Sequence, residues 1–581
     1  MALSNFAETV HGHHLLLSKV CPLWNWNLND ILSWLDNCGN DHKYCNTSIS
    51  ALFFPTRVVD VHNIKNGLVV LRDKKEVLGS NFDGGRPEGT YPHYWTLSHR
   101  WGDPKKIIQL LGGNPDKGTT SNEEQFRNGI SLNEFSPTFR DAMELVDKMG
   151  YRYIWIDCLC IFQDSSSDWE QEARMMKDVY ENSFCNISAI RSSYDVSLGL
   201  FGPRLAEPSL VYPFSVDLEL PHLGDGQTEE WTFWYTNLWD DEINRAPLIR
   251  RGWVVQERFL ARRTIHFARD QIYWECVEHL RCEADPEGRL GLVGVMAGWQ
   301  AIQKRRGLKD SLRMIIKHLH PELEAPSLWD LSRWSTPQGC WRTIVTTYSS
   351  CDLTKESDRL IAISGVAKKF GEVIGGRYLA GLWERGLHTD LMWLSNASQG
   401  DAVRPSDFFA PSWSWASICG GNITVAISSP LGFGEPSSLI ELIDARFKPK
   451  SHNGDPMGLL ASAELDIECR PYYFKKAGNL RTLEMYADQA LSEIVPQRVE
   501  LDSLKLDTEE LVRKYKQDMD IDVVCVPVYS EPVGHGRVSV KCILLEPNPK
   551  STSSYRRVGV LIWDGIGGSW DSAVRTRITL V

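Results

Sequence analysis

The sequence predicts an α/β protein in which helices flank a mixed or parallel sheet, with helical additions and a β-rich C-terminal region. Strand-like and helix-like patterns alternate between residues 91 and 200, which is typical of such a sheet. Beyond about residue 440 the pattern changes to alternating β-rich runs. The chain has 581 residues, and single cores stop growing at about 250–300 residues. We therefore expect two or three structural units.

The elements of the α/β region follow from apolar periodicity and from turn residues. A helix is expected in the run Trp24–Trp34 and a strand at Arg57–Val61, both within the lead-in segment. Gly150 is expected to cap the helix over Phe139–Met149, and Asp168 is expected to be the N-cap of the next helix. The remaining expected strands are Tyr94–Ser98, Tyr153–Asp157 and Phe184–Ile190.

Four segments are expected along the chain. These are a lead-in segment (1–90), an α/β core (91–260), a mixed, largely helical region that packs on the core (261–440), and a β-rich region (441–581). Helical patterns occur at Leu312–Leu319 and Leu360–Phe370, and β-rich runs include Asp522–Cys525 and Val558–Leu561.

Composition excludes several classes of protein. The apolar fraction of 42% and charged fraction of 24% are those of a globular chain. The formal charge of −12 argues against a nucleic-acid binder, which needs a basic surface. We find no signal-peptide pattern and no apolar run long enough to span a membrane. The 14 cysteines are therefore expected in a reducing compartment, and we expect a cytoplasmic protein.

Three separated motifs resemble those of a known family. They are Tyr94–Gly102 (YWTLSHRWG), Tyr153–Asp164 (YIWIDCLCIFQD) and Arg251–Arg258 (RGWVVQER). In this order they resemble the heterokaryon-incompatibility (HET) domain of fungi, at about residues 94–260. The resemblance implies a role in self/non-self recognition and induced cell death.

The α/β core is also similar in arrangement to Toll/interleukin-receptor (TIR) domains, a Rossmann-like group that includes NAD-cleaving enzymes. Those enzymes carry a glutamate shortly after a tryptophan; here Trp169 and Glu172 stand three apart, one residue from the usual spacing. A carboxylate can stabilise the ribosyl cation formed when NAD is cleaved. The resemblance therefore makes Glu172 a candidate catalytic residue. Asp157 is a second candidate, because it ends a core strand at the place where ligands bind such sheets and could contact a ribose hydroxyl. The alternatives are a dipole-favoured acid for Glu172 and a loop-holding role for Asp157.

Residues at the carboxyl ends of the strands are expected to face a ligand crevice. Arg100 suits a phosphate. Trp101 suits stacking on a base or core packing, and Gln163 suits a ligand or a backbone turn. A loop-holding role is favoured for Asp164. The candidate nucleotide-binding residues are Ser98, His99, Arg100, Trp101, Gln163 and Trp169.

Other chemistries are less favoured by the residues. A Cys160–His99 nucleophile is weighed against plain core packing, which the apolar neighbours of Cys160 favour. The spacing Cys38-x3-His42-x2-Cys45 offers three zinc ligands without an obvious fourth, so packing is favoured and no metal is predicted. The charged run Arg251–Arg258 is expected to form buried ion pairs or to contribute to the crevice. Phosphate-loop and dinucleotide-fingerprint motifs do not occur, which disfavours an ATPase or a dehydrogenase.

Three functions remain open. The first is an effector or regulator of incompatibility cell death that cleaves NAD, with NAD as substrate rather than resident cofactor. The second is a non-enzymatic signalling module that self-associates or binds a protein partner. The third is a small-molecule enzyme of a fungal secondary-metabolite pathway.

Overall fold

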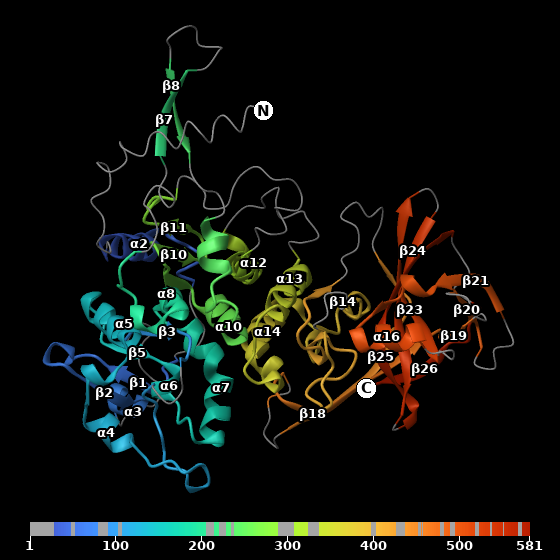
Figure 1. Ribbon diagram of the computed structural model, residues 1–581, viewed down its shortest axis with the longest axis horizontal. Coiled ribbons are helices and arrows are strands. Elements are labelled where there is room, and N and C mark those ends of the chain that lie inside the picture. The colour runs from blue at the N-terminus through green and yellow to red at the C-terminus, as the bar shows by residue number, and fades with distance from the viewer. Residues whose placement is uncertain are drawn as a thin grey trace. The chain divides into compact units, whose positions relative to one another are not determined.

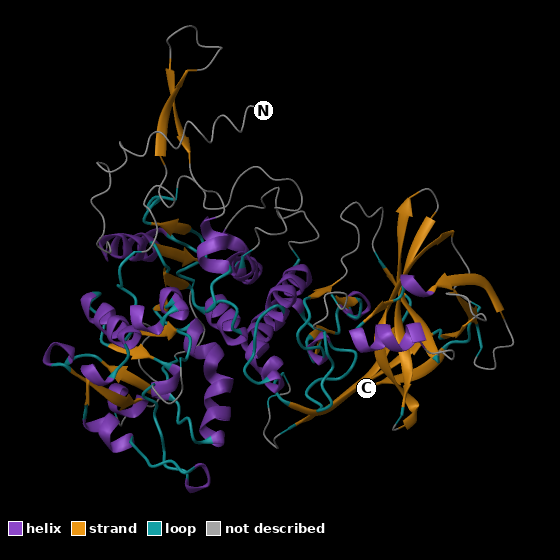
Figure 2. Cartoon of the chain, viewed as in Figure 1, coloured by secondary structure: helices purple, strands orange, loops and turns teal. Residues whose placement is uncertain are grey.

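The computed structural model forms two compact units, Met1–Lys317 and His318–Val581. Figure 2 shows that the first combines helices with a sheet, whereas the second is rich in strands. The described residues are 28–47, 53–79, 91–102, 107–204, 214–219, 228–233, 238–288, 307–323, 336–396, 402–425, 436–450, 455, 457–476, 482–488, 494–517, 522–534, 537–549, 551–566 and 572–581.

A mixed sheet organises the first unit. In the described part of the chain its strand order is β11-β10-β9-β6-β3-β5-β1-β2-β4. The central strands β9, β6, β3 and β5 run parallel, and antiparallel strands extend the sheet on both sides. The strands are β1 (Arg57–Asp60), β2 (Leu68–Asp73), β3 (Tyr94–Ser98), β4 (Ile130–Ser131), β5 (Tyr153–Trp155), β6 (Cys185–Ser188), β9 (Arg263–Phe267), β10 (Ile272–Cys276) and β11 (Leu280–Cys282). The predicted α/β class is confirmed.

The order of the parallel strands indicates where a ligand is expected to bind. Numbered along the chain, β3, β5, β6 and β9 stand in the spatial order second, first, third, fourth. This is the doubly wound arrangement, in which the connections leave the first strand in opposite directions. The switch point therefore lies between β3 and β6, where Ser98 pairs with Ser188. Ligands of such sheets bind outside the carboxyl ends of the strands at this point.

Helices cover both faces of the sheet. Figure 1 shows α5 (Pro137–Lys148) on one side of the strands, and α7 (Ser166–Glu181) with α10 (Gly252–Leu260) on the other. α5 begins after Ser136, whose hydroxyl accepts the Phe139 N–H, and Gly150 follows its end with a φ of 81°. Glycine adopts this left-handed conformation at little cost, as predicted.

The predicted start of α7 was wrong. Its N-cap is Ser165, whose side chain accepts the N–H of Asp168. Asp168 lies inside the first turn because its carboxylate is engaged by Arg57 and by the N–H of Phe162.

The remaining elements of the first unit surround this layer. The predicted N-terminal helix is α2; residues before 28 lie outside the described part. The described elements are α2 (Leu28–Asp41), α3 (Lys74–Leu78), α4 (Glu123–Asn128), α6 (Asp157–Cys160), α8 (Ile190–Tyr194), the hairpin β7 (Phe214–Glu219) and β8 (Thr228–Phe233), and α12 (Leu308–Leu319).

The second unit begins with helices and ends in β structure, which confirms the predicted β-rich region. Its described helices are α13 (Pro337–Ser349), α14 (Ile361–Ile374), α15 (Leu387–Asp390) and α16 (Glu509–Gln517). Two small sheets pair β12 (Tyr378–Leu379) with β13 (Leu382–Trp383), and β14 (Trp393–Ser395) with β15 (Ile423–Val425).

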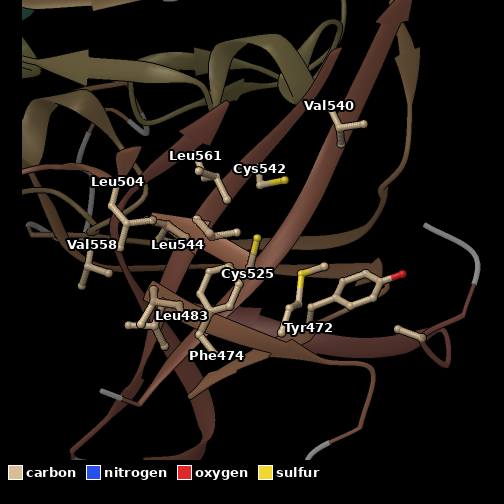
Figure 3. Packing of buried hydrophobic residues seen from close by; sticks show 14 of the residues in the cluster. Tyr472, Phe474, Leu483, Leu504, Cys525, Val540, Cys542, Leu544, Val558 and Leu561 are labelled. Carbon is tan, nitrogen blue, oxygen red and sulfur yellow. The ribbon is translucent and has the colours of Figure 1, made fainter. Parts of the chain in front are cut away.

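A large sheet forms the rest of the second unit, with the path β17-β18-β26-β25-β24-β23-β19-β20-β21 and with β16 and β22 paired to β23 and β25. Figure 3 shows its core, where Phe474, Leu483, Cys525 and Leu544 pack together. The strands are β16 (Ser437–Ser438), β17 (Glu441–Pro449), β18 (Leu460–Cys469), β19 (Tyr472–Lys476), β20 (Thr482–Tyr486), β21 (Ile494–Glu500), β22 (Lys505–Leu506), β23 (Val523–Gly534), β24 (Arg537–Asn548), β25 (Ser551–Ile566) and β26 (Thr576–Leu580).

Within the described residues, no helix is both long and apolar enough to cross a membrane. The described cysteines are free thiols.

Candidate functional site

Residues from two elements meet at the switch point: the end of β3 and the second half of α10. The hydroxyl of Ser98 donates a hydrogen bond of 2.5 Å to Oε2 of Glu257. Asn186, on β6, donates to the same hydroxyl over 3.0 Å. All three residues are buried. The first and third sequence motifs are therefore joined by a polar contact at the place where a ligand is expected.

Glu257 titrates near neutrality. Burial, together with the charge of nearby Asp157, raises its pKa to about 7 against the lowering effects of Ser98, Arg251 and Tyr180. A carboxyl group with such a pKa can both accept and return a proton at physiological pH. Glu257 was assigned from the sequence only to a charged cluster, and the third motif was the signal that marked it.

Asp157 provides a carboxylate that solvent reaches. Its side chain is 26% exposed, and it begins α6, where it accepts the N–H of Cys158 at 2.7 Å. The indole of Trp101 donates to its other oxygen over 2.8 Å, and Nε2 of His99 lies 3.7 Å away. Burial lowers the pKa of His99, which favours the neutral imidazole. Ser98, His99, Trp101 and Asp157 thus lie in one region with Glu257.

Glu172 lies in a separate network on α7. Its side chain is 1% exposed, and Oε1 is 3.4 Å from Arg57, which also forms two bonds of 2.7 and 2.6 Å to Asp168. Burial raises the pKa of Glu172 to about 7, although Arg57 lowers it. Within the described part of the chain, no hydrogen bond or ion pair joins Glu172 to Asp157. The sequence did not identify Arg57, because it lies on the lead-in strand far from the motif that it supports.

Of the other residues predicted to bind a ligand, Arg100 lies at the surface and Gln163 has a structural role. Arg100 is exposed, and its guanidinium reaches the carbonyl of Ser193 over 3.4 Å. The amide of Gln163 donates to the carbonyls of Asp157 and Ile161, at 3.2 and 3.0 Å. Gln163 therefore holds the loop after β5.

Trp169 and Asp164 also have structural partners. Trp169 packs edge-on against Trp253 of α10, with ring centroids 6.2 Å apart. Asp164 accepts the N–H groups of Gly112 and Gly113 at 2.8 and 2.9 Å. The first contact joins α7 to α10, and the second holds the loop at residues 112–113.

The cysteines of the second motif do not fit a nucleophile. Burial raises the pKa of Cys160 to about 12 and that of Cys158 well above its ordinary value. Both thiols therefore stay protonated at neutral pH, and the thiolate is the reactive form. Cys158 also lies with His99 and Asp157 in a group whose ligand atoms are within 4.8 Å of one another. Among the described residues this group offers only three ligand atoms, one fewer than a structural zinc site uses.

Arg258, on α10, contacts strand β10 near one edge of the sheet rather than the residues at the switch point. It forms a two-pronged ion pair with Glu275 at 2.7 and 2.8 Å, and His266 lies 3.1 Å from the same carboxylate. Burial raises the pKa of Glu275, but Arg258 and His266 together hold it well below its usual range. The motif Arg251–Arg258 therefore serves both roles considered from the sequence, with Glu257 in the crevice and Arg258 in a buried ion pair.

The fold and the site define a doubly wound α/β domain with a buried cluster of polar and titratable side chains at its switch point. Residues 94–257 match the family model described as heterokaryon incompatibility protein (HET). This part of the chain is therefore a HET domain. No curated protein and no solved structure matches the chain significantly. The similarity to TIR domains is thus a fold-level analogy without a structural match.

Proposed function

We propose that this protein is an effector of fungal incompatibility cell death and that its HET domain binds and cleaves NAD in the switch-point crevice. The HET domain associates the chain with heterokaryon incompatibility. The observation that carries the chemical proposal is the cluster of Ser98, Asp157 and Glu257, where a solvent-reached carboxylate lies near a carboxyl group of pKa about 7.

Cleavage would break the bond between the ribose carbon C1′ and the nicotinamide nitrogen, which leaves with the electron pair as neutral nicotinamide. The positive charge that develops on the ribose is stabilised by the Asp157 carboxylate, which Trp101 orients. A water molecule attacks C1′ and loses a proton to Glu257. Arg100, exposed just beyond the end of β3, would meet the diphosphate.

Glu172 enters this proposal as a residue that acts with Arg57. The pair holds the start of α7, and Arg57 also donates to the carbonyl of Cys160 over 2.7 Å. Cys160 ends the short helix that begins at Asp157. Neutralising Glu172 would therefore disturb the position of Asp157 as well as remove a carboxylate.

The test is nicotinamide release from NAD by the purified full chain, compared with Asp157→Asn and Glu172→Gln. The matched control is Asp178→Asn, an acidic residue of α7 whose side chain is 42% exposed. We expect release by the wild type and by the control, and a loss of roughly 100-fold or more in Asp157→Asn. Release that survives both Asp157→Asn and Glu172→Gln unchanged would remove the proposed chemistry.

Two other results would redirect the function. Cell death that persists in both variants, with oligomers intact and no turnover, would support a self-associating signalling module. Turnover of a different metabolite, lost in Asp157→Asn, would support a biosynthetic enzyme that uses the same crevice.

A further inference from the structure

Four potential metal ligands converge at the edge of the first sheet, away from the crevice. Cys38 lies in the last turn of α2, His42 and Cys45 follow that helix, and Cys276 ends β10. All four side chains are buried, and their ligand atoms lie within 4.8 Å of one another. His42 and Cys276 are 234 residues apart in the sequence, so only the fold reveals the fourth ligand.

The distances match the coordination of zinc. Nδ1 of His42 lies 3.7 Å from the sulfur of Cys45 and 3.4 Å from the sulfur of Cys276. Tetrahedral Zn²⁺, with bonds of about 2.3 Å to sulfur and about 2.0–2.1 Å to nitrogen, places such atoms about 3.5 Å apart. Three sulfurs and one imidazole are a ligand set that structural zinc sites use, and soft sulfur ligands disfavour Mg²⁺ and Ca²⁺.

The groups around the four ligands suit a metal–thiolate centre. Nε of Arg263 donates to the sulfur of Cys38 over 3.1 Å, and the N–H of His279 donates to the sulfur of Cys276 over 3.2 Å. Three thiolates and a neutral imidazole around Zn²⁺ carry one net negative charge. The cation of Arg263 compensates that charge, as does buried Lys309, whose charge interacts with Cys45 and Cys276. Hydrogen bonds of this kind orient the ligands of metal sites.

The ligand loop is held in shape by its own contacts. The side-chain amide of Asn46 donates to the carbonyls of Cys38 and His42, at 2.7 and 2.8 Å. Arg263 in turn donates to the side-chain carbonyl of Asn46 over 2.5 Å. The N–H of Tyr44 donates to Glu278, just after β10, over 2.6 Å. The loop is therefore organised around the point where the four ligand atoms meet.

We propose that Cys38, His42, Cys45 and Cys276 bind one structural Zn²⁺ that fastens helix α2 to strand β10. With four protein ligands the centre has no open position for a substrate, which is the mark of a structural rather than a catalytic site. The metal joins the lead-in segment to the sheet immediately after the HET domain. The proposal does not depend on the proposed NAD chemistry.

The experiment measures the metal bound to the full chain, purified without added metal or chelator. We expect one zinc per chain in the wild type and a loss of most of it in Cys276→Ser. The matched control is Cys282→Ser, because Cys282 is a buried cysteine of the adjacent strand β11 outside the cluster; it should keep its zinc. Far-ultraviolet circular dichroism checks that both variants fold.

X-ray absorption at the zinc edge of the wild type decides the ligand set even if Cys276→Ser fails to fold. Three sulfurs and one nitrogen are expected, and removal of the metal should lower the thermal midpoint of the first unit. A wild-type chain that neither contains nor takes up zinc would overturn the proposal. Equal zinc in Cys276→Ser and Cys282→Ser, or a shell of oxygen and nitrogen alone, would also overturn it.

Discussion

Carboxyl groups are buried both at the centre of the first sheet and near its edge, but their partners and their pKa values differ. At the edge, Glu275 is paired with Arg258 and hydrogen-bonded to His266, so that its pKa is well below the usual range. At the centre, Glu257 faces the hydroxyl of Ser98, and burial keeps its pKa near 7. Both carboxyl groups are almost inaccessible to solvent.

This difference in pKa distinguishes a structural ion pair from a carboxyl group that can take part in proton transfer. A buried carboxylate that is fully compensated by a guanidinium contributes to the fold and gives up its proton-transfer ability near neutral pH. A buried carboxyl group that is stabilised mainly by neutral donors keeps a pKa at which it can exchange protons. Functional sites concentrate perturbed groups of the second kind.

The edge should show the largest effect on stability. Glu275→Gln leaves the Arg258 guanidinium buried without its counter-charge, and we expect a loss of about 3–5 kcal/mol in the free energy of unfolding. Denaturant unfolding followed by circular dichroism measures it. The control is Asp241→Asn, whose partner Arg245 is 76% exposed, and it should change stability by less than about 1 kcal/mol. Similar losses of unfolding free energy in Glu275→Gln and Asp241→Asn would contradict the structural role of the buried ion pair.

The carboxyl group of Glu257 at the centre should make stability depend on pH between about pH 4.5 and 7. The pKa of Glu257 in the folded chain is raised above its ordinary 4.5 to about 7, so the folded state binds the proton more tightly than the unfolded state. This stabilisation is present below pH 4.5 and is lost as the pH rises to about 7. Relative to Glu257→Gln, the wild type should lose on the order of 3 kcal/mol of stability over this range. Parallel pH profiles of the two proteins would show that Glu257 does not titrate there.

The hydrogen bond between Ser98 and Glu257 should have an intermediate effect. Ser98→Ala removes the hydroxyl that donates to Oε2 and should destabilise the chain by about 1–3 kcal/mol. Because this donor favours the charged carboxylate, its loss should also shift the Glu257-dependent step of the stability profile to higher pH. Unfolding measured at several pH values tests both effects. An unchanged pH profile would show that the Ser98 hydroxyl does not influence the pKa of Glu257.

The smallest stability effect is expected for Trp101→Phe. This change keeps a ring of similar character and removes the N–H that donates to Asp157 over 2.8 Å. We expect a loss of only about 0.5–1.5 kcal/mol in stability, together with a larger proportional loss of NAD turnover. Parallel unfolding and nicotinamide-release measurements separate the two. A loss of stability without a loss of turnover would mean that Trp101 is only a packing residue.

Local sequence patterns predicted the secondary structure of the α/β region. Contacts between residues far apart in the sequence could not be predicted in the same way. The strand Tyr94–Ser98 and the helix after Ser136 follow from apolar periodicity and capping residues, which act over a few residues. Arg57 and Cys276 were not assigned to a site, because each meets its partners across more than 100 residues of chain. The carboxyl-end rule led to Ser98 and Asp157, but no sequence pattern distinguished the environment of Glu257 from that of neighbouring Arg258.

The most direct test of the crevice is equilibrium binding of ADP-ribose, the part of NAD that remains after nicotinamide leaves, measured by isothermal titration calorimetry on the full chain. The account predicts one site per chain and binding that weakens about tenfold, or about 1.4 kcal/mol, in Arg100→Ala. Binding should be unchanged in the control Asp241→Asn, which removes an acidic group paired with the exposed Arg245. No detectable binding to the wild type, or equal binding to the wild type and Arg100→Ala, would contradict a nucleotide site at the carboxyl ends of β3 and β6.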